Sequence, residues 1–171
     1  MRSVEAFGRL CLLAVFLWSA FSKIRNFTDF RQHVATTIPR LASVAGPLAA
    51  AVTTAECAAA FLLFHPLEWV GVAVAALLLA AFTVYLLTLM RTDPEASCGC
   101  AGVTDTSVSG VHVVRNAILI ADCGAIWWVT SYSAGPSLFD YAVMAGPAAA
   151  AAVVVLHLGE LAAFFRPAAM K

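Results

Sequence analysis

Five long apolar runs constrain the fold of this 171-residue chain more than any other feature. A helix that crosses a hydrocarbon core of about 30 Å needs roughly 20 apolar residues. Backbone polar groups must be satisfied internally within lipid, so each run should form a helix. The sequence therefore predicts an all-α, multi-pass transmembrane helix bundle that forms one integral membrane domain, 1–171. The expected spans are 4–22, 41–64, 69–90, 111–132 and 141–165, with the connections 23–40, 65–68, 91–110 and 133–140.

The composition also indicates that this chain is embedded in a lipid bilayer. Hydrophobic residues make up 62% of the sequence and charged residues 12%, and the mean hydropathy is +0.89. A soluble domain is nearer half apolar and a quarter charged, so a water-soluble globule is excluded. Ten basic residues balance ten acidic ones, which excludes the basic surface of a nucleic-acid-binding protein.

The first apolar run has some features of a secretory signal peptide, but we expect an uncleaved helix. The run is long, and the candidate cleavage site Trp18-Ser19-Ala20 places a bulky residue where a small one is required.

The charges of the connections predict an orientation in the cell membrane. Five spans place the connections 23–40 and 91–110 on one side, together with the C-terminal tail. That side carries seven basic residues, whereas the other side carries Arg2 and Arg9. By the positive-inside rule, the side with seven basic residues faces the cytoplasm.

Several ionisable or polar residues fall inside the apolar runs, where a charge costs at least about 2.5 kcal/mol near the bilayer centre. Glu56 lies in the second run and Asp122 in the fourth, and Arg115 and Asn116 open the fourth. We expect Arg115 to pair with Glu56 or Asp122 and so to fix the register of the helices. Proton handling by the acidic residues is the alternative. His157 and Glu160 are three residues apart and should share a helical face.

The connection 91–110 contains the motif Cys98-Gly99-Cys100, the most informative stretch of the sequence. Glycine permits the bend that would bring the two sulfurs together in a small disulfide ring. A ring of this size should be strained, and strained disulfides exchange readily. Two alternatives stay open, namely ordinary loop cysteines and a soft-metal site with His112 as a third ligand.

Three further cysteines lie in the apolar runs. Cys11 and Cys57 are expected to act as small hydrophobic residues. Cys123, beside Asp122, is a candidate relay for a disulfide because its helix follows the cysteine connection. Its depth below Arg115 argues against direct exchange with the loop pair.

These motifs together resemble the MauE family of methylamine-utilisation, DoxX-like, redox-associated membrane proteins. The similarity extends from about Gly8 to Glu160, and Ala101 replaces a phenylalanine common in the family. It rests on Phe21-Ser22-Lys23-Ile24 with Phe30, on Glu56, on Cys98-Gly99-Cys100-Ala101-Gly102 and on Val114-Arg115-Asn116. By position, the resemblance implies that Cys98 and Cys100 form the redox pair, and that Lys23, Glu56, Arg115 and Asn116 are polar residues of the same site.

The resemblance also implies a function and a type of partner. Family members are associated with disulfide formation or electron supply for exported proteins, often beside thioredoxin-like proteins, and the disulfide-rich light subunit of methylamine dehydrogenase is the implied beneficiary. That role requires Cys98 and Cys100 to face outward, opposite to the charge rule, so the orientation stays open.

Three classes of function are consistent with the sequence. The first is a membrane thiol–disulfide oxidoreductase, with a membrane quinone as the inferred electron acceptor. The second is a soft-metal or small-solute carrier, and the third is a non-catalytic membrane scaffold.

Overall fold

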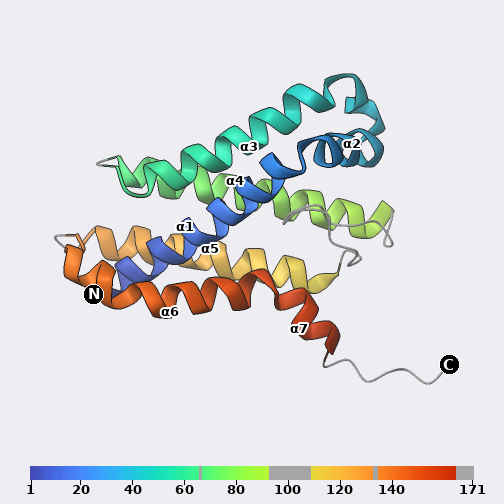
Figure 1. The fold of residues 1–171 in the computed structure, drawn as a ribbon. Helices are drawn as coiled ribbons and strands as arrows, with labels where there is room; N and C mark the ends of the chain where they lie inside the picture. The colour runs from blue at the N-terminus through green and yellow to red at the C-terminus, as the bar shows by residue number, and fades with distance from the viewer. Residues whose placement is uncertain (66, 93–108, 133–134, 165–171) are drawn as a thin grey trace.

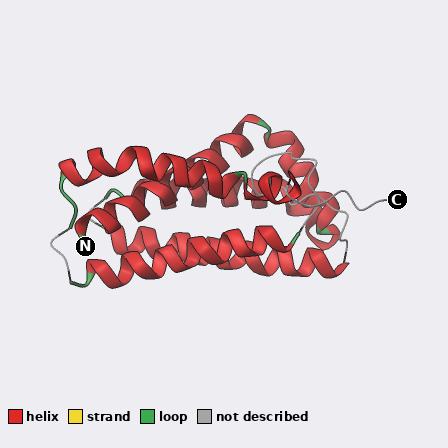
Figure 2. Ribbon diagram, turned by 90° about the horizontal axis from the view of Figure 1, so that it is seen from below, coloured by secondary structure: helices red, strands yellow, loops and turns green. Residues whose placement is uncertain are grey.

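The computed structural model describes residues 1–65, 67–92, 109–132 and 135–164. In these residues the chain forms seven α-helices and one 3-10 helix, and it has no strand (Figure 1; Figure 2). In chain order they are α1 (Arg2–Arg25), α2 (Phe27–Thr37), η1 (Pro39–Val44), α3 (Ala45–Leu62), α4 (Glu68–Thr92), α5 (Gly110–Thr130), α6 (Leu138–Leu156) and α7 (Leu158–Phe164).

Five of these helical segments are long and apolar enough to cross a membrane, which confirms the predicted fold class. They are Arg2–Arg25, Pro39–Leu62, Glu68–Thr92, Gly110–Thr130 and Leu138–Leu156. Each of the first four agrees with its predicted span to within a few residues. The second begins as the 3-10 helix η1, where Pro39 occupies the first turn and needs no backbone N–H partner.

The fifth span, predicted as one helix over 141–165, ends earlier. The helix α6 starts at a capping box, in which Ser137 and Asp140 each bond the other's backbone, and it ends at Leu156. His157 leaves helical geometry, with φ −95° and ψ 13°, and α7 turns away from the axis of α6 (Figure 1). His157 and Glu160 therefore do not share the face of one continuous helix, because the chain changes direction between them.

The connection predicted over 23–40 contains the helix α2. Phe27, Phe30 and Val34 recur at helical spacing, and Val34 is buried. Polar side chains, among them Arg31 and Gln32, are exposed on the rest of the helix. An amphipathic helix of this kind is suited to the boundary between lipid and water.

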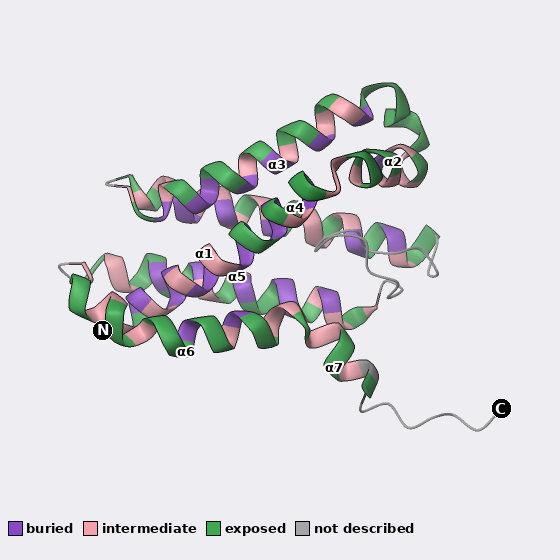
Figure 3. Cartoon of the chain, in the orientation of Figure 1, coloured by how far each residue is buried: buried purple, intermediate pink, exposed green. Residues whose placement is uncertain are grey.

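The helix α1 lies at the centre of the bundle. It contacts α2, α3, α5 and α6, and 56% of its most apolar stretch is buried, against 11% for α6. Figure 3 shows the buried positions on the inward faces of the helices and a largely exposed α6. Leu12, Leu63, Leu79, Leu119 and Ile126 belong to the main core, so α1, α3, α4 and α5 meet there.

The bundle has two ends that differ in their elements. We call the end that carries α2, η1, the last turn of α4, the first turn of α5 and α7 the α2 end (Figure 1). The opposite end, called the N-terminal end, carries the first turns of α1, α4 and α6. Thr92, the last residue of α4, and Gly110, the first residue of α5, both lie at the α2 end.

Candidate functional site

A buried ion pair joins α1 to α3 toward the α2 end. The ammonium of Lys23 lies 2.8 Å from Oε1 and 3.1 Å from Oε2 of Glu56. It also donates to the hydroxyl of Ser19 at 2.6 Å, and this hydroxyl donates to Oε1 of Glu56 at 2.9 Å. Ser19 and Lys23 are four residues apart on α1, so they share the face that meets α3. These hydrogen bonds join all three side chains to one another.

This group is withdrawn from solvent and lipid. Lys23 is 1% exposed and Glu56 is 0% exposed. The rings of Phe30 and Phe82 flank the ammonium of Lys23, with centroids at 5.4 and 5.6 Å from Nζ. Aromatic faces attract a cation, and this attraction offsets part of the cost of removing Lys23 from water.

Arg115 and Asn116 of α5 belong to the same site. Together with Ser19 and Glu56 they line a cavity of about 30 Å³, which has room for about two water molecules. The remaining walls are apolar. The sequence similarity placed Lys23, Glu56, Arg115 and Asn116 in one site, and the structure brings these four residues together, from three helices, around the ion pair and the cavity beside it.

The prediction that Arg115 pairs with Glu56 or Asp122 was wrong. Among the described residues, neither Glu56 nor Asp122 forms a salt bridge with Arg115, and the partner of Glu56 is Lys23. Lys23 lies one turn beyond Ser19 on α1 and reaches Glu56 directly, whereas Arg115 lies across the small cavity. The guanidinium of Arg115 is buried, and its Nε has no hydrogen-bond partner there. Within the part of the chain that the structure describes, Arg115 is thus a buried cation without a carboxylate partner.

Two neighbours of Arg115 complete this part of α5. The side-chain amide of Asn116 donates a long hydrogen bond, of 3.4 Å, to the hydroxyl of Thr83 on α4. His112 is buried against Gly159 of α7, and its Nε2 has no hydrogen-bond partner among the residues that the structure describes. No three His, Cys, Asp or Glu side chains gather in a way that could hold a metal ion in residues 1–65, 67–92, 109–132 and 135–164.

The two cysteines of the predicted redox pair, Cys98 and Cys100, lie outside the described residues. Cys11, Cys57 and Cys123 are free thiols. Cys11 and Cys123 belong to the same apolar core, in keeping with small hydrophobic residues, whereas Cys57 is exposed on α3.

The predicted relay partner Asp122 packs against Gly8 of α1. A Cβ on that glycine would lie 2.5 Å from Oδ1 of Asp122, so a larger residue at position 8 would require the carboxylate to shift. Oδ2 of Asp122 is buried and has no hydrogen-bond partner in the described part of the chain.

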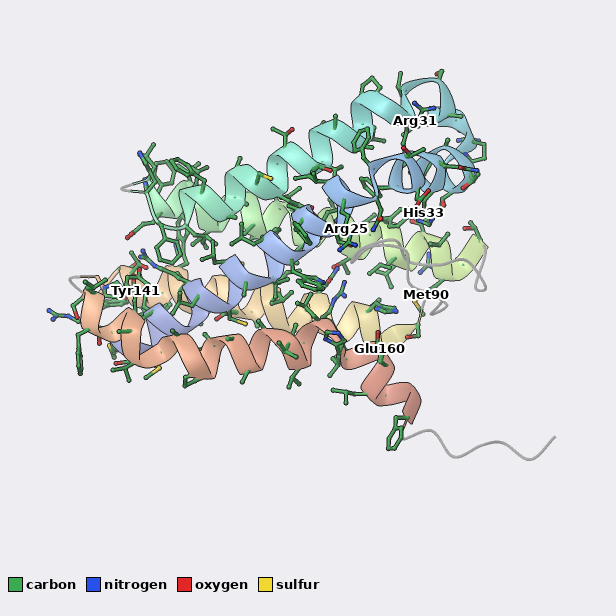
Figure 4. All side chains as sticks on the ribbon, in the orientation of Figure 1. Arg25, Arg31, His33, Met90, Tyr141 and Glu160 are labelled. Carbon is green, nitrogen blue, oxygen red and sulfur yellow. The ribbon has the colours of Figure 1, made fainter. Side chains whose placement is uncertain are left out.

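The sequence analysis missed a second charged cluster, which lies at the N-terminal end. The guanidinium of Arg9 binds Glu5 and, through Nη1, Oε2 of Glu68 at 2.5 Å. The hydroxyl of Thr130 donates to Glu5 at 3.2 Å. Glu5 and Arg9 are four residues apart in an apolar run, and this spacing could have revealed the pair. Figure 4 shows Tyr141 near this end, far from Arg25 and His33 near the α2 end.

Taken together, the five apolar helices and the buried polar site define an integral, multi-pass membrane protein. Residues 1–130 match the family described as methylamine utilisation protein MauE. The match covers most of the chain, and the protein belongs to that family. No curated protein and no solved structure matches the chain.

Proposed function

We propose that this protein supports thiol–disulfide exchange for a partner protein, with Cys98 and Cys100 as the exchanging pair. The observation that carries the proposal is the buried polar site at the α2 end, where a cation without a carboxylate partner, Arg115, lies five residues after Gly110. Both cysteines fall in the sequence between Thr92, the last residue of α4, and Gly110, the first residue of α5, and these two residues lie at this same end.

Electrostatics links such a site to thiol chemistry. The thiolate is the reactive form of cysteine, and nearby cations favour it over the thiol. Arg115 supplies a positive charge that no described carboxylate neutralises, whereas the charge of Lys23 is balanced by Glu56. An anion that approached this end of the bundle would complete the pairing that Arg115 lacks.

The exchange proceeds in two balanced steps. A thiolate of the partner attacks one sulfur of the Cys98–Cys100 disulfide, forms a mixed disulfide and releases the other cysteine as a thiolate. The second thiolate of the partner then attacks the mixed disulfide, so the partner leaves oxidised and Cys98 and Cys100 become a dithiol. Return to the disulfide transfers two electrons and two protons to an acceptor, and a membrane quinone has the required stoichiometry.

The proposed partner is an exported protein with disulfides, or a thioredoxin-like protein that acts on one. The family description names methylamine utilisation, and the disulfide-rich light subunit of methylamine dehydrogenase fits this type of partner.

Single-cysteine variants test the proposal. Cys98→Ala and Cys100→Ala should each be expressed in cells and analysed on non-reducing gels and by mass spectrometry. Thiol–disulfide exchange is reversible, so the remaining thiolate of a variant can attack a disulfide of the partner. We expect one variant to accumulate a partner adduct that disappears on reduction, because the second cysteine that would release the partner in this direction is missing. If neither variant traps a partner, and the double variant keeps full biological activity, a scaffold role replaces the redox role.

A further inference from the structure

The cavity that Arg115 lines has a positive charge in its wall that the described part of the chain does not neutralise. Arg115 is 7% exposed, and its Nε has no hydrogen-bond partner among the described residues. The salt bridges of residues 1–65, 67–92, 109–132 and 135–164 do not include it. A charge buried between helices carries a large cost of desolvation, which an ion of opposite sign can offset.

The other charges of this site are already paired with each other. The ammonium of Lys23 contacts both carboxylate oxygens of Glu56, and the hydroxyl of Ser19 donates to one of them. The charges of Lys23 and Glu56 therefore cancel. Asp122, the only carboxylate of α5, lies seven residues beyond Arg115, which is about 10 Å along the helix axis. One positive charge thus remains beside the cavity.

The size of the cavity limits the anion that could pair with this charge. The volume of about 30 Å³ has room for about two water molecules. Phosphate, sulfate and carboxylates have at least three non-hydrogen atoms, so they would fit only if side chains moved aside. A halide ion is a single atom of a size similar to one water molecule, and chloride is the common halide of biological fluids.

The donors around the cavity also suit a small anion. The guanidinium of Arg115 has five N–H donors. The side-chain amide of Asn116 has two, and its long bond to Thr83 uses one of them. Most of the remaining wall is apolar and includes Leu79 and Leu119. Water could accept the same hydrogen bonds, but it would not neutralise the charge.

We propose that this cavity is a binding site for chloride, held by the guanidinium of Arg115 and the side-chain amide of Asn116. Arg115 lies five residues after Gly110, about 8 Å along α5, so the ion would enter from the α2 end. Bound chloride would stabilise the contact of α5 with α1, since both helices border the cavity. Its binding does not rest on the proposed thiol exchange, because none of the described cysteines lines the cavity.

The thermal unfolding midpoint of the purified full-length protein in detergent tests the site. Sodium chloride, bromide, gluconate and sulfate are compared at equal ionic strength. A ligand of the folded state raises its stability, so chloride at about ten times its dissociation constant should raise the midpoint by about 3–6 °C. Bromide should act in the same way, whereas gluconate and sulfate are too large to enter. A rise as large in gluconate or sulfate as in chloride would overturn the assignment.

Broadening of the chloride NMR signal measures binding directly, because a bound chloride nucleus relaxes faster than a free one. We expect a broadening that saturates with chloride and is displaced by bromide. Arg115→Met should abolish it, whereas Arg115→Lys keeps the charge and should bind about tenfold more weakly, since the forked donors are lost. Arg91→Met is the matched control, because Arg91 is exposed at the same end of the bundle.

A chloride response that survives in a folded Arg115→Met protein would contradict the site, as would its loss in the Arg91→Met protein. If Arg115→Met does not fold, the comparison of the four anions on the unchanged protein decides the question by itself.

The same measurements in a Cys98→Ala, Cys100→Ala double variant separate the two proposals. We expect an unchanged chloride response, because neither cysteine is needed for the ion to bind. A normal chloride response together with a failed partner trap would refute thiol exchange and support the chloride site. A successful trap in a protein without a chloride response would refute the chloride site alone.

Discussion

Lys23 and Glu56 form an ion pair that offsets the cost of burying their two charges. Each ion alone would carry a large desolvation cost, but their contact at 2.8 Å and the hydroxyl of Ser19 satisfy both charges. Part of this arrangement could be anticipated, since the family resemblance placed both residues in one site. Their direct pairing could not, because it depends on how α1 and α3 pack and rotate against each other.

The buried pair leads to a prediction about stability. Lys23→Met and Glu56→Gln should each lower the free energy of unfolding by about 3 kcal/mol, because the remaining polar group loses its partner inside the bundle. The double variant should be more stable than the sum of the two losses predicts. Unfolding of the purified protein in detergent, followed by circular dichroism, measures all four free energies of the cycle.

Glu160→Gln provides the matched control for this cycle. Glu160 is exposed on α7, near the α2 end (Figure 4), and its loss should change the free energy of unfolding by no more than about 0.5 kcal/mol. Strictly additive effects of the Lys23 and Glu56 substitutions would contradict a direct ion pair.

The start of α4 packs closely against the C-terminal end of α3 at Gly71. A Cβ on Gly71 would lie 2.7 Å from the backbone carbon of Leu62 and 2.7 Å from the nitrogen of Leu63. Backbone atoms cannot move aside as a flexible side chain can, so the two helices approach only because position 71 lacks a side chain. Small residues play this role widely in membrane helices, where packing rather than hydrophobicity drives association.

Gly71→Ala should therefore destabilise the bundle by about 1–3 kcal/mol, the usual cost of forcing extra atoms into a packed interface. The thermal unfolding midpoint in detergent measures the effect. Gly124→Ala is the matched control, since a Cβ on Gly124 meets no atom within 4 Å. It should leave stability unchanged or raise it slightly, because alanine favours the helix more than glycine does. Equal midpoints for the two variants would show that α3 and α4 are not in this close contact.

For the whole molecule, the arrangement of the five spans determines which segments share a side of the membrane. The helix α2, the start of α5 and α7 gather at the α2 end, whereas the first turns of α1 and α6 lie at the other (Figure 1). Thr92 and Gly110, the helix ends between which Cys98 and Cys100 fall in the sequence, both lie at the α2 end. The side of the membrane that this end faces therefore decides which partners the cysteines can meet.

Labelling of single cysteines in a cysteine-free background tests this topology. Thr36→Cys, exposed on α2, and Ser131→Cys, exposed at the N-terminal end, should react with a membrane-impermeant maleimide from opposite sides of the membrane. Intact and permeabilised cells provide the two measurements. Reaction of both positions in intact cells would contradict an odd number of spans between them. The position that reacts first in intact cells identifies the outward end, and so resolves the conflict between the positive-inside rule and an exported partner.

The sequence alone determined the membrane-spanning helices, because an apolar run near 20 residues in lipid has no alternative to a helix. It did not reveal α2, whose 11 residues are too polar and too short for a hydropathy signal. It also gave no sign of the break at His157, because the apolar character continues through this residue into α7.

Tertiary structure decided which charges meet. The sequence predicted that Arg115 pairs with Glu56 or Asp122, but the face of α1 that carries Ser19 and Lys23 is the one that meets Glu56 on α3. The contact between Nε2 of His33 and the hydroxyl of Tyr85, at 3.0 Å, likewise required α2 and α4 to come together. The hydropathy of a helix indicates whether it can lie in lipid. The partners of its polar residues are set by the rotation and contacts of helices that are distant in the sequence.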